Sequence, residues 1–388
     1  MTRRTLQAAA LALCLGGAAL ADTQGVTDTE IRIGSYSDLS GPVAVWGVAA
    51  ANGQRMRYDE VNAEGGIHGR KITFLVEDMQ YQVPLAVRAA NRLVNRDKVF
   101  AMVANVGTPH NNATMPKQLA AGVPNVFPLT AALSMFEPAN PLTIGYLTSY
   151  RDQTVGGMKY LVEATGKKKV CLQTQATDFG AEVELGFDAA VRDLGLEVTA
   201  VGRHRTAETE FTGSVTSLKN SGCEILVLGT FVRDTLQMYT AVREAGWDVP
   251  VIGNMVPLIP LIAETPEMDG LYVAAPFALP DFEAARETAP AVHDWYTRYV
   301  AEFGQEPNPQ AQIGYVMADL VVTALKAAGP DVTAESFMQA FNGISDYRDI
   351  FDGPNISYSK TKRSGMDSLI LSQVQNGEWV VIKEELPF

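Results

Sequence analysis

The apolar and polar positions in the first half of the chain follow two spacings, one typical of strands and one typical of helices. Short apolar runs bounded by polar residues indicate buried strands, whereas apolar residues three and four positions apart indicate amphipathic helices. The apolar runs predict strands at residues 31–36, 71–76, 99–104 and 123–127. The helical spacing predicts helices at residues 49–62, 86–95 and 115–121.

A second series of the same kind begins near residue 150. It predicts strands at residues 170–174, 197–201, 224–229 and 249–253. It predicts helices at residues 154–165, 182–194, 211–220 and 235–245. Each series repeats the order strand, helix, strand, which implies a parallel sheet with helices on both faces.

The last hundred residues contain elements that do not make a third core. Helical spacing predicts helices at residues 289–303, 312–328 and 334–342. Two predicted strands, 368–374 and 378–382, flank Asn376-Gly377, which is a strong signal for a tight hairpin. We interpret these elements as additions to two lobes, so the chain must cross between the lobes more than once.

The first 21 residues have the features of a secretory signal peptide. Arg3 and Arg4 precede an apolar run that ends in Ala-Leu-Ala at residues 19–21, the small-residue pattern that signal peptidase recognises. The run is too short for a confident membrane span, and no later stretch is predicted to cross a membrane. We therefore expect cleavage after Ala21, a soluble chain in the periplasm and no direct membrane insertion.

The net charge and the length of the chain indicate which classes of partner it can bind and how many domains it has. The 388 residues carry a net charge of −13, and removing the two leader arginines makes the chain more acidic. This sign argues against nucleic acid and anionic membrane surfaces as partners. The residues left after cleavage correspond to two domains of about 100–200 residues each. With 47% hydrophobic residues, the chain has material for two cores.

Two cysteines, Cys171 and Cys223, remain once Cys14 leaves with the leader. They could pair in an oxidising periplasm. Each lies in or beside a predicted strand, however, where a buried free thiol is common. We therefore expect two free thiols.

The sequence carries no recognisable catalytic or metal-binding constellation. It has no G-x-S-x-G, H-E-x-x-H, P-loop or paired C-x-x-C motif. An S-x-x-K match at residues 359–362 lies near a predicted crossing and is interpreted as chance. The four histidines, at positions 68, 110, 204 and 293, lack the spacing of metal ligands. We expect no enzyme activity, no cofactor and no metal.

Several motifs near the start of the mature chain resemble one protein family. They are Ile-Arg-Ile-Gly at 31–34, Leu-Ser-Gly-Pro-Val at 39–43, Trp46-Gly47 and Asn-Ala-Glu-Gly-Gly-Ile at 62–67. Together they resemble the periplasmic branched-chain amino-acid (Leu/Ile/Val) binding proteins. The resemblance continues through residues 71–78, 122–128 and 229–244 to the C-terminal hairpin, and so covers nearly the whole mature chain.

The resemblance implies the architecture of a type I periplasmic binding protein. That is an α/β fold with two doubly wound parallel-sheet lobes joined by a three-stranded hinge. The crossings are expected near residues 148–151, 276–280 and 352–355. The N-terminal lobe would then comprise residues 22–149 and 280–352, and the C-terminal lobe residues 150–279 and 353–388. A small-molecule ligand would occupy the cleft at the carboxyl ends of the strands, hinge closure would enclose it, and an inner-membrane ABC permease would receive it.

Five candidate ligand-binding residues lie in the first lobe. Trp46 follows a turn that opens a helix, although a core position is the structural alternative. Asn105 leads into Thr108, which aligns with the hydroxyl residue that grips the ligand carboxylate in the family. The structural alternative for Thr108 is a helix cap, and both roles can hold at once. Thr130 and Ala131 lie in the next loop, where Ala131 aligns with a threonine of the family and Thr130 is one residue earlier.

Three candidates lie in the second lobe. Phe179 and Phe231 follow strands and could enter the cleft or belong to the local core. Met255 aligns with an acidic residue that pairs with the ligand ammonium in amino-acid-binding members. A methionine cannot do this, and an unpaired buried ammonium costs several kcal/mol. Asp78 and Asp178 are the candidate substitutes.

These residues predict an organic acid with an aromatic or otherwise apolar body as the ligand. Two alternatives stay open: an amino-acid- or amide-binding member of the same family, and a sensor component that presents its closed form to a membrane receptor. Both use the same two-lobed clamp.

Overall fold

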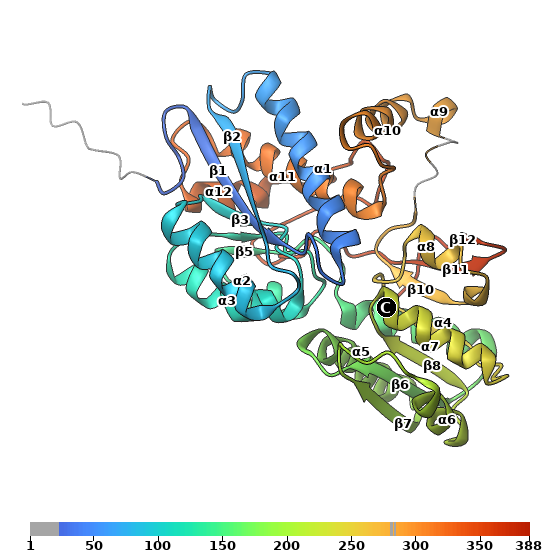
Figure 1. Cartoon of the computed structure of the whole chain (residues 1–388). Coiled ribbons are helices and arrows are strands. Elements are labelled where there is room, and N and C mark those ends of the chain that lie inside the picture. The colour runs from blue at the N-terminus through green and yellow to red at the C-terminus, as the bar shows by residue number, and fades with distance from the viewer. Residues whose placement is uncertain (1–22, 280–281, 283–284) are drawn as a thin grey trace, which may run out of the picture.

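The computed structural model of the chain describes residues 23–279, 282 and 285–388. Two lobes, each built on its own sheet, lie side by side (Figure 1). The predicted signal peptide and its cleavage site after Ala21 lie outside the described residues.

The first lobe is built on a five-stranded parallel sheet in the order β2-β1-β3-β4-β5. Its strands are β1 (Glu30–Ser37), β2 (Lys71–Asp78), β3 (Ala101–Val103), β4 (Asn125–Val126) and β5 (Thr143–Ile144). The helices that connect them are α1 (Ala44–Ala63), α2 (Val83–Asn91) and α3 (Thr108–Ala120). The residues of β3, β4 and β5 are buried, as expected for a parallel sheet covered on both faces.

The second lobe is built on a seven-stranded sheet in the order β12-β11-β10-β9-β8-β6-β7. Its strands are β6 (Lys169–Gln175), β7 (Glu197–His204), β8 (Ile225–Gly229), β9 (Val251–Gly253), β10 (Tyr272–Ala275), β11 (Ile370–Gln375) and β12 (Glu378–Lys383). Its helices are α4 (Tyr150–Thr165), α5 (Asp178–Leu194), α6 (Thr212–Asn220), α7 (Val232–Glu244) and α8 (Pro260–Ala263). β11 runs antiparallel to both of its neighbours, β10 and β12, and the other strand pairs of this sheet are parallel.

Between β10 and β11 the chain returns to the first lobe. There it forms α9 (Ala285–Thr288), α10 (Pro290–Phe303), α11 (Pro309–Ala328) and α12 (Ala334–Ala340). By length and composition α11 could cross a membrane, contrary to the sequence-based expectation that no stretch qualifies, but 67% of its apolar window is buried inside the protein. It lies beside α1 in the first lobe (Figure 1).

Two glycines allow α1 and α11 to touch backbone to backbone. A Cβ on Gly53 of α1 would overlap the carbonyl oxygen of Ala311, and a Cβ on Gly314 of α11 would overlap that of Ala50. The absence of side chains at these two points therefore sets the separation of the two longest helices in the lobe.

The structure corrects the expected position of the chain's third crossing and adds two strands that were not predicted. The backbone N–H of Gly145 donates to the carbonyl of Arg363 (2.8 Å), and that of Met366 donates to the carbonyl of Tyr146 (3.0 Å). Residues 363–366 thus run beside β5, so the third crossing follows Met366 rather than residues 352–355. Strands β5 (Thr143–Ile144) and β10 (Tyr272–Ala275) were not predicted from the sequence.

The two mature cysteines form a disulfide, so the expectation of free thiols was wrong. Cys171 lies in β6 and Cys223 lies just before β8, and these strands are direct neighbours in the sheet. In the sequence β7 lies between β6 and β8, but in the sheet it pairs with the other side of β6. The order of strands along the chain therefore did not predict that Cys171 and Cys223 are close.

The close approach of α1 and α11 leads to a stability prediction. Gly314→Ala should lower the free energy of unfolding by about 1–3 kcal/mol, because the added methyl group forces the two helices apart. Gly213→Ala in α6 is the control, since its Cβ would meet no atom within 4 Å. Urea unfolding followed by circular dichroism measures both. A Gly314→Ala variant as stable as the control would contradict the backbone contact.

Candidate functional site

A cavity lies between the lobes, where the carboxyl ends of the strands in both sheets face each other. It is lined by Val43, Val45, Trp46, Tyr81, Val106, Gly107, Thr108, Leu129, Tyr150, Phe179, Phe231, Val232 and Val256. Most of these residues lie in the loops that follow strands or in the first turns of the next helices. The cavity measures about 30 Å³, which is room for one or two water molecules. A larger ligand therefore requires the lobes or the lining side chains to move.

Aromatic rings form much of the cavity wall. Phe179 and Phe231 of the second lobe stack with their centroids 4.9 Å apart. Tyr150 meets Phe179 edge to face at 5.0 Å, and Tyr81 meets Phe231 in the same way at 5.2 Å. Because Tyr81 follows β2 in the first lobe, its contact with Phe231 joins the two lobes across the cavity.

The polar groups at the cavity are hydroxyl and N–H groups. The hydroxyl of Thr108 shares a hydrogen bond of 2.7 Å with that of Thr130. The indole N–H of Trp46 is buried and has no hydrogen-bond partner among the described residues. Burial raises the pKa of Tyr150 to about 12, so its phenol is neutral and can donate near neutral pH. Thr108 also begins α3, whose N-terminus adds a partial positive charge.

Four of the eight predicted site residues line the cavity, namely Trp46, Thr108, Phe179 and Phe231. The other four are Asn105, Thr130, Ala131 and Met255, and none of them lines it. Thr130 and Ala131 lie behind Thr108 and Tyr150, with the Ala131 carbonyl accepting from the Tyr150 backbone N–H at 2.8 Å.

Asn105 ties strands together instead of facing the cavity. Its side-chain oxygen accepts from the backbone N–H of Tyr36 (3.2 Å), and its side-chain amide donates to Asn125 (3.0 Å). Met255 is fully buried, and its backbone N–H donates to the side-chain oxygen of Gln153. Its neighbour Val256 lines the cavity instead.

None of the aspartates and glutamates in the described ranges lines the cavity. Asp38 turns toward the backbone N–H groups of Gly41 and Val43. Asp78 accepts from the Ser40 hydroxyl at 2.6 Å, and Asp178 accepts from an asparagine of α3. Neither acid considered as a substitute partner for an ammonium therefore reaches the cavity. The described residues also contain no cluster of three or more His, Cys, Asp or Glu that could hold a metal ion.

Sequence reasoning missed Tyr81 and Tyr150. Tyr81 follows β2 of the first lobe, and Tyr150 is the first residue of α4, where Ser149 caps the helix. The helix was predicted to begin at residue 154, because its first turn is not part of the apolar stripe. A serine followed three residues later by Asp152 was the available signal for the earlier start.

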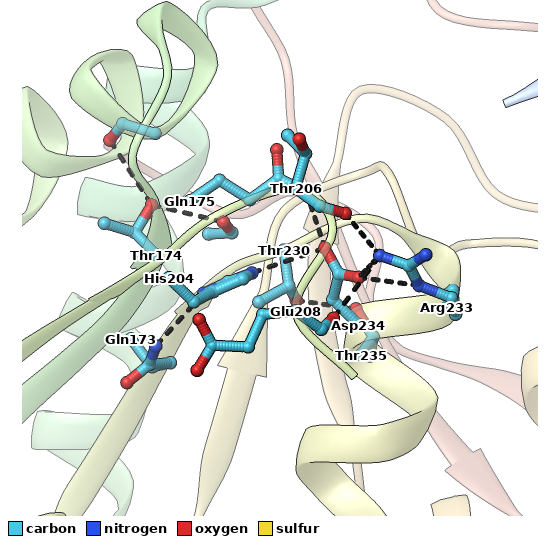
Figure 2. Close-up of polar contacts among 12 residues, drawn as sticks. Gln173, Thr174, Gln175, His204, Thr206, Glu208, Thr230, Arg233, Asp234 and Thr235 are labelled. Atoms are coloured by element: carbon cyan, nitrogen blue, oxygen red, sulfur yellow. Dashed lines mark hydrogen bonds and ion pairs between the residues drawn. The ribbon is translucent and has the colours of Figure 1, made fainter. Parts of the chain in front are cut away.

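A buried polar cluster fixes the helix that follows Phe231 (Figure 2). Asp234, in the first turn of α7, accepts hydrogen bonds from Gln175 (2.5 Å) and His204 (3.3 Å) at the ends of β6 and β7. Arg233 pairs with the same carboxylate and also donates to the carbonyl of Thr206. The cluster thus ties α7 to two strands and one loop, and holds the start of α7 at the cavity.

A hydrogen-bonded seam joins the lobes beside the cavity. The side-chain amide of Asn112 in α3 donates to Asp178 of α5 (2.8 Å), and the Ser134 hydroxyl donates to Asn112 (3.0 Å). The backbone N–H of Leu133 donates to the Glu182 carboxylate of α5 (3.0 Å). Burial raises the pKa of Glu182, although hydrogen bonds from residues 133–134 oppose the rise.

Known proteins resemble this chain along most of its length. A model of the family described as "Periplasmic binding protein" matches residues 30–378. The Leu/Ile/Val-binding protein homolog 7 of Brucella suis is 23% identical over 389 residues, which cover 95% of each chain.

Two solved structures share the fold. The first is a fatty acid ABC transporter substrate-binding protein from Thermomonospora curvata, with a TM-score of 0.84, 21% identity and 95% of each chain covered. The second is a branched-chain amino acid ABC transporter from Thermus thermophilus with bound valine, with a TM-score of 0.83, 20% identity and 94% of this chain and 97% of that chain covered. They confirm the two-lobed α/β fold predicted from the sequence, and at this identity they show the fold alone.

The polar cluster around Asp234 leads to a prediction about pH. Burial disfavours the charged carboxylate, but hydrogen bonds from His204, Gln175 and Arg233 outweigh it and hold the pKa of Asp234 below its usual range. The carboxylate should therefore stabilise the fold above its unfolded pKa of about 3.9, and lose this contribution as the pH falls through the lower folded value. Asp234→Asn should cost about 2 kcal/mol at pH 7.

The measurement is urea unfolding of Asp234→Asn and the parent protein from neutral to acid pH. The difference in unfolding free energy should be constant near neutrality and shrink in acid. Asp188→Asn, an exposed position on α5, is the matched control and should show little difference at any pH. A difference for Asp234→Asn that stays constant into strong acid would contradict the assignment.

Proposed function

We propose that this chain, which belongs to the periplasmic binding protein family, captures an organic acid with an apolar body and delivers it to an ABC importer of the inner membrane. The family match over residues 30–378 confirms the resemblance stated from the sequence. The periplasm as the working compartment agrees with the family and with the leader-like residues 1–21. The role is capture and release of a solute, without chemistry on it.

The chemistry of the cavity wall carries the proposal for the ligand. The wall combines stacked aromatic rings with hydroxyl and N–H donors, and no carboxylate in the described residues faces it. A ligand carboxylate could be met by the Thr108 hydroxyl, the Trp46 indole N–H and the N-terminus of α3, because charge-assisted hydrogen bonds are strong in a dry site. An α-ammonium would find no anionic partner, and its desolvation would cost several kcal/mol.

An amino acid is the second candidate ligand. The relatives favour it, since one is named a Leu/Ile/Val-binding protein homolog and one solved structure is described with bound valine. Another related structure is described as a fatty acid transporter component. Members of one fold thus differ in ligand, so the side chains at the cavity decide between the candidates. In this chain Val256 and Met255 provide no charge for an ammonium.

Capture would proceed by closure of the two lobes around the ligand. The contacts of Tyr81 with Phe231 and of Leu133 with Glu182 join the lobes in the structure, and the cavity between them is too small for a drug-sized ligand. Ligand entry then requires these contacts to open. We propose that the seam of Asn112, Leu133, Asp178 and Glu182 re-forms on closure and contributes to ligand affinity without touching the ligand.

A thermal-shift screen tests the ligand class. Protein stripped of bound solute should be stabilised by octanoate and phenylacetate, which carry a carboxylate and no ammonium. It should not be stabilised by leucine, which carries both groups. At 100 times the dissociation constant, binding adds about 2.7 kcal/mol of stability. Val256→Glu should reverse the preference toward leucine, and Val256→Gln is the matched neutral control. Micromolar binding of leucine by the unmodified protein would overturn the organic-acid proposal.

Glu182→Ala tests the seam. It leaves the backbone N–H of Leu133 without its acceptor in the closed form only, so affinity should fall by about tenfold, mostly through faster dissociation. Asp188→Ala on the exposed side of the same helix should leave affinity unchanged. Calorimetry and stopped-flow dissociation measure both variants, and small-angle scattering reports closure. Equal dissociation rates in the two variants would remove the seam from the mechanism.

A further inference from the structure

We propose that the first lobe carries a second binding site, separate from the cavity between the lobes, for a small organic oxyanion. The site is the groove between α12 and the segment that leads into β5, and its central cation is Arg363. None of the residues that line this groove lines the cavity between the lobes. The inference therefore does not depend on the ligand proposed for that cavity.

Arg363 is an exception among the basic residues of the protein. It is the only lysine or arginine in the described residues that is buried, with 8% of its surface exposed. Its guanidinium makes no ion pair with any described carboxylate. The half-buried Arg57, by contrast, pairs with both Asp319 and Glu60. A buried charge without a counter-ion is costly, so an anion that reached it would be bound favourably.

The hydrogen bonds of Arg363 leave donors for such an anion. Its Nε and Nη2 atoms donate to the carbonyl oxygen of Thr143 at 3.2 and 2.6 Å, and Nη1 donates to the side-chain oxygen of Asn342 at 3.3 Å. A guanidinium has five N–H groups, of which these bonds use three. One N–H remains on each of Nη1 and Nη2. Arginine binds carboxylate and phosphate oxygens through such donors, often in pairs. Burial also lowers the pKa of Arg363, as expected for a cation without a counter-ion.

The groove has the size and lining of a small-molecule site. Its volume is about 680 Å³, within the usual range of ligand pockets. Lys360 adds a second cation at the rim and makes no ion pair with any described residue, and Asn140 and Gln339 add amides. Glu335 is the one acid in the lining, and it accepts a hydrogen bond from Gln339 at 3.0 Å.

The remaining lining is apolar and indicates what the anion carries. Pro141 and Leu142 come from the segment before β5, and Met338 comes from the buried side of α12. Apolar surface next to two cations suits an organic acid or a phosphate ester better than a bare inorganic ion. The shared chemistry is an oxyanion head on a small apolar body.

The test uses protein labelled with ¹⁵N-arginine and two probes, benzoate and inorganic phosphate. Titration of either oxyanion should shift one arginine Nε–H signal saturably, and Arg363→Lys should identify that signal by removing it. Lys360→Ala and Gln339→Glu should each weaken binding by about two- to fivefold, through loss of a rim cation and gain of an acid. Lys383→Ala, an exposed lysine of β12, is the matched control and should change nothing. Tighter binding of benzoate than of phosphate would support a carboxylate as the ligand's oxyanion. Tighter binding of phosphate would support a phosphate group.

If Arg363→Lys fails to fold, the Lys360 and Gln339 variants still test the site. Both residues are exposed, and their substitution keeps the hydrogen bonds of Arg363 to Thr143 and Asn342. A titration without any saturable arginine shift would overturn the site and leave Arg363 as a tether between β5 and residue 342. The same would follow if Lys360→Ala and Gln339→Glu bound the probes as tightly as Lys383→Ala. Failure of the cavity ligand screen leaves this titration unaffected, since its signal arises at Arg363.

Discussion

The parallel arrangement of the strands is the constraint on which the rest of this structure depends. In a parallel sheet every strand ends at the same edge, so the loops that follow the strands collect there. Two such sheets face each other in this protein, and the loops after β1, β2, β3, β4, β8 and β9 all contribute to one cavity. The helices that begin in these loops direct their N-termini toward the same space. The apolar contacts and the N–H donors of the cavity thus both follow from the direction of the strands.

The electrostatics of the cavity follow from where the acids are used. Asp38 and Asp78 hold the turn before α1 through backbone and hydroxyl hydrogen bonds, and Asp178 and Glu182 hold the seam between the lobes. Each carboxylate is therefore committed to shaping the cleft instead of facing a ligand. What remains at the cavity is an apolar wall with neutral donors. Such a wall favours a ligand that brings its own negative charge.

Two buried charged groups show how differently the lobes treat a charge. In the second lobe Asp234 is surrounded by donors from β6, β7 and α7, so its charge is fully satisfied and stabilises the local fold. In the first lobe Arg363 is surrounded by neutral acceptors, so its charge is only partly balanced. The hydrogen bonds to Asp234 hold the start of α7 in place, whereas Arg363 keeps two N–H groups that can bind an anion.

The sequence by itself determined the fold class and most of the elements, because the periods of strands and helices are local properties of the chain. Of the eight site residues predicted from loops after strands and from the family resemblance, four line the cavity. Trp46, Thr108, Phe179 and Phe231 could be placed in this way. Only the tertiary structure decided which strands are neighbours, and so joined Cys171 to Cys223 and carried residues 363–366 back beside β5. It also decided the register after β9, where Val256 and not Met255 meets the cavity. Adjacent residues can direct their side chains to opposite sides, and pairing across a sheet joins residues far apart in sequence. Neither the side-chain direction in a loop nor the strand pairing can therefore be predicted from the spacing of apolar residues along the chain.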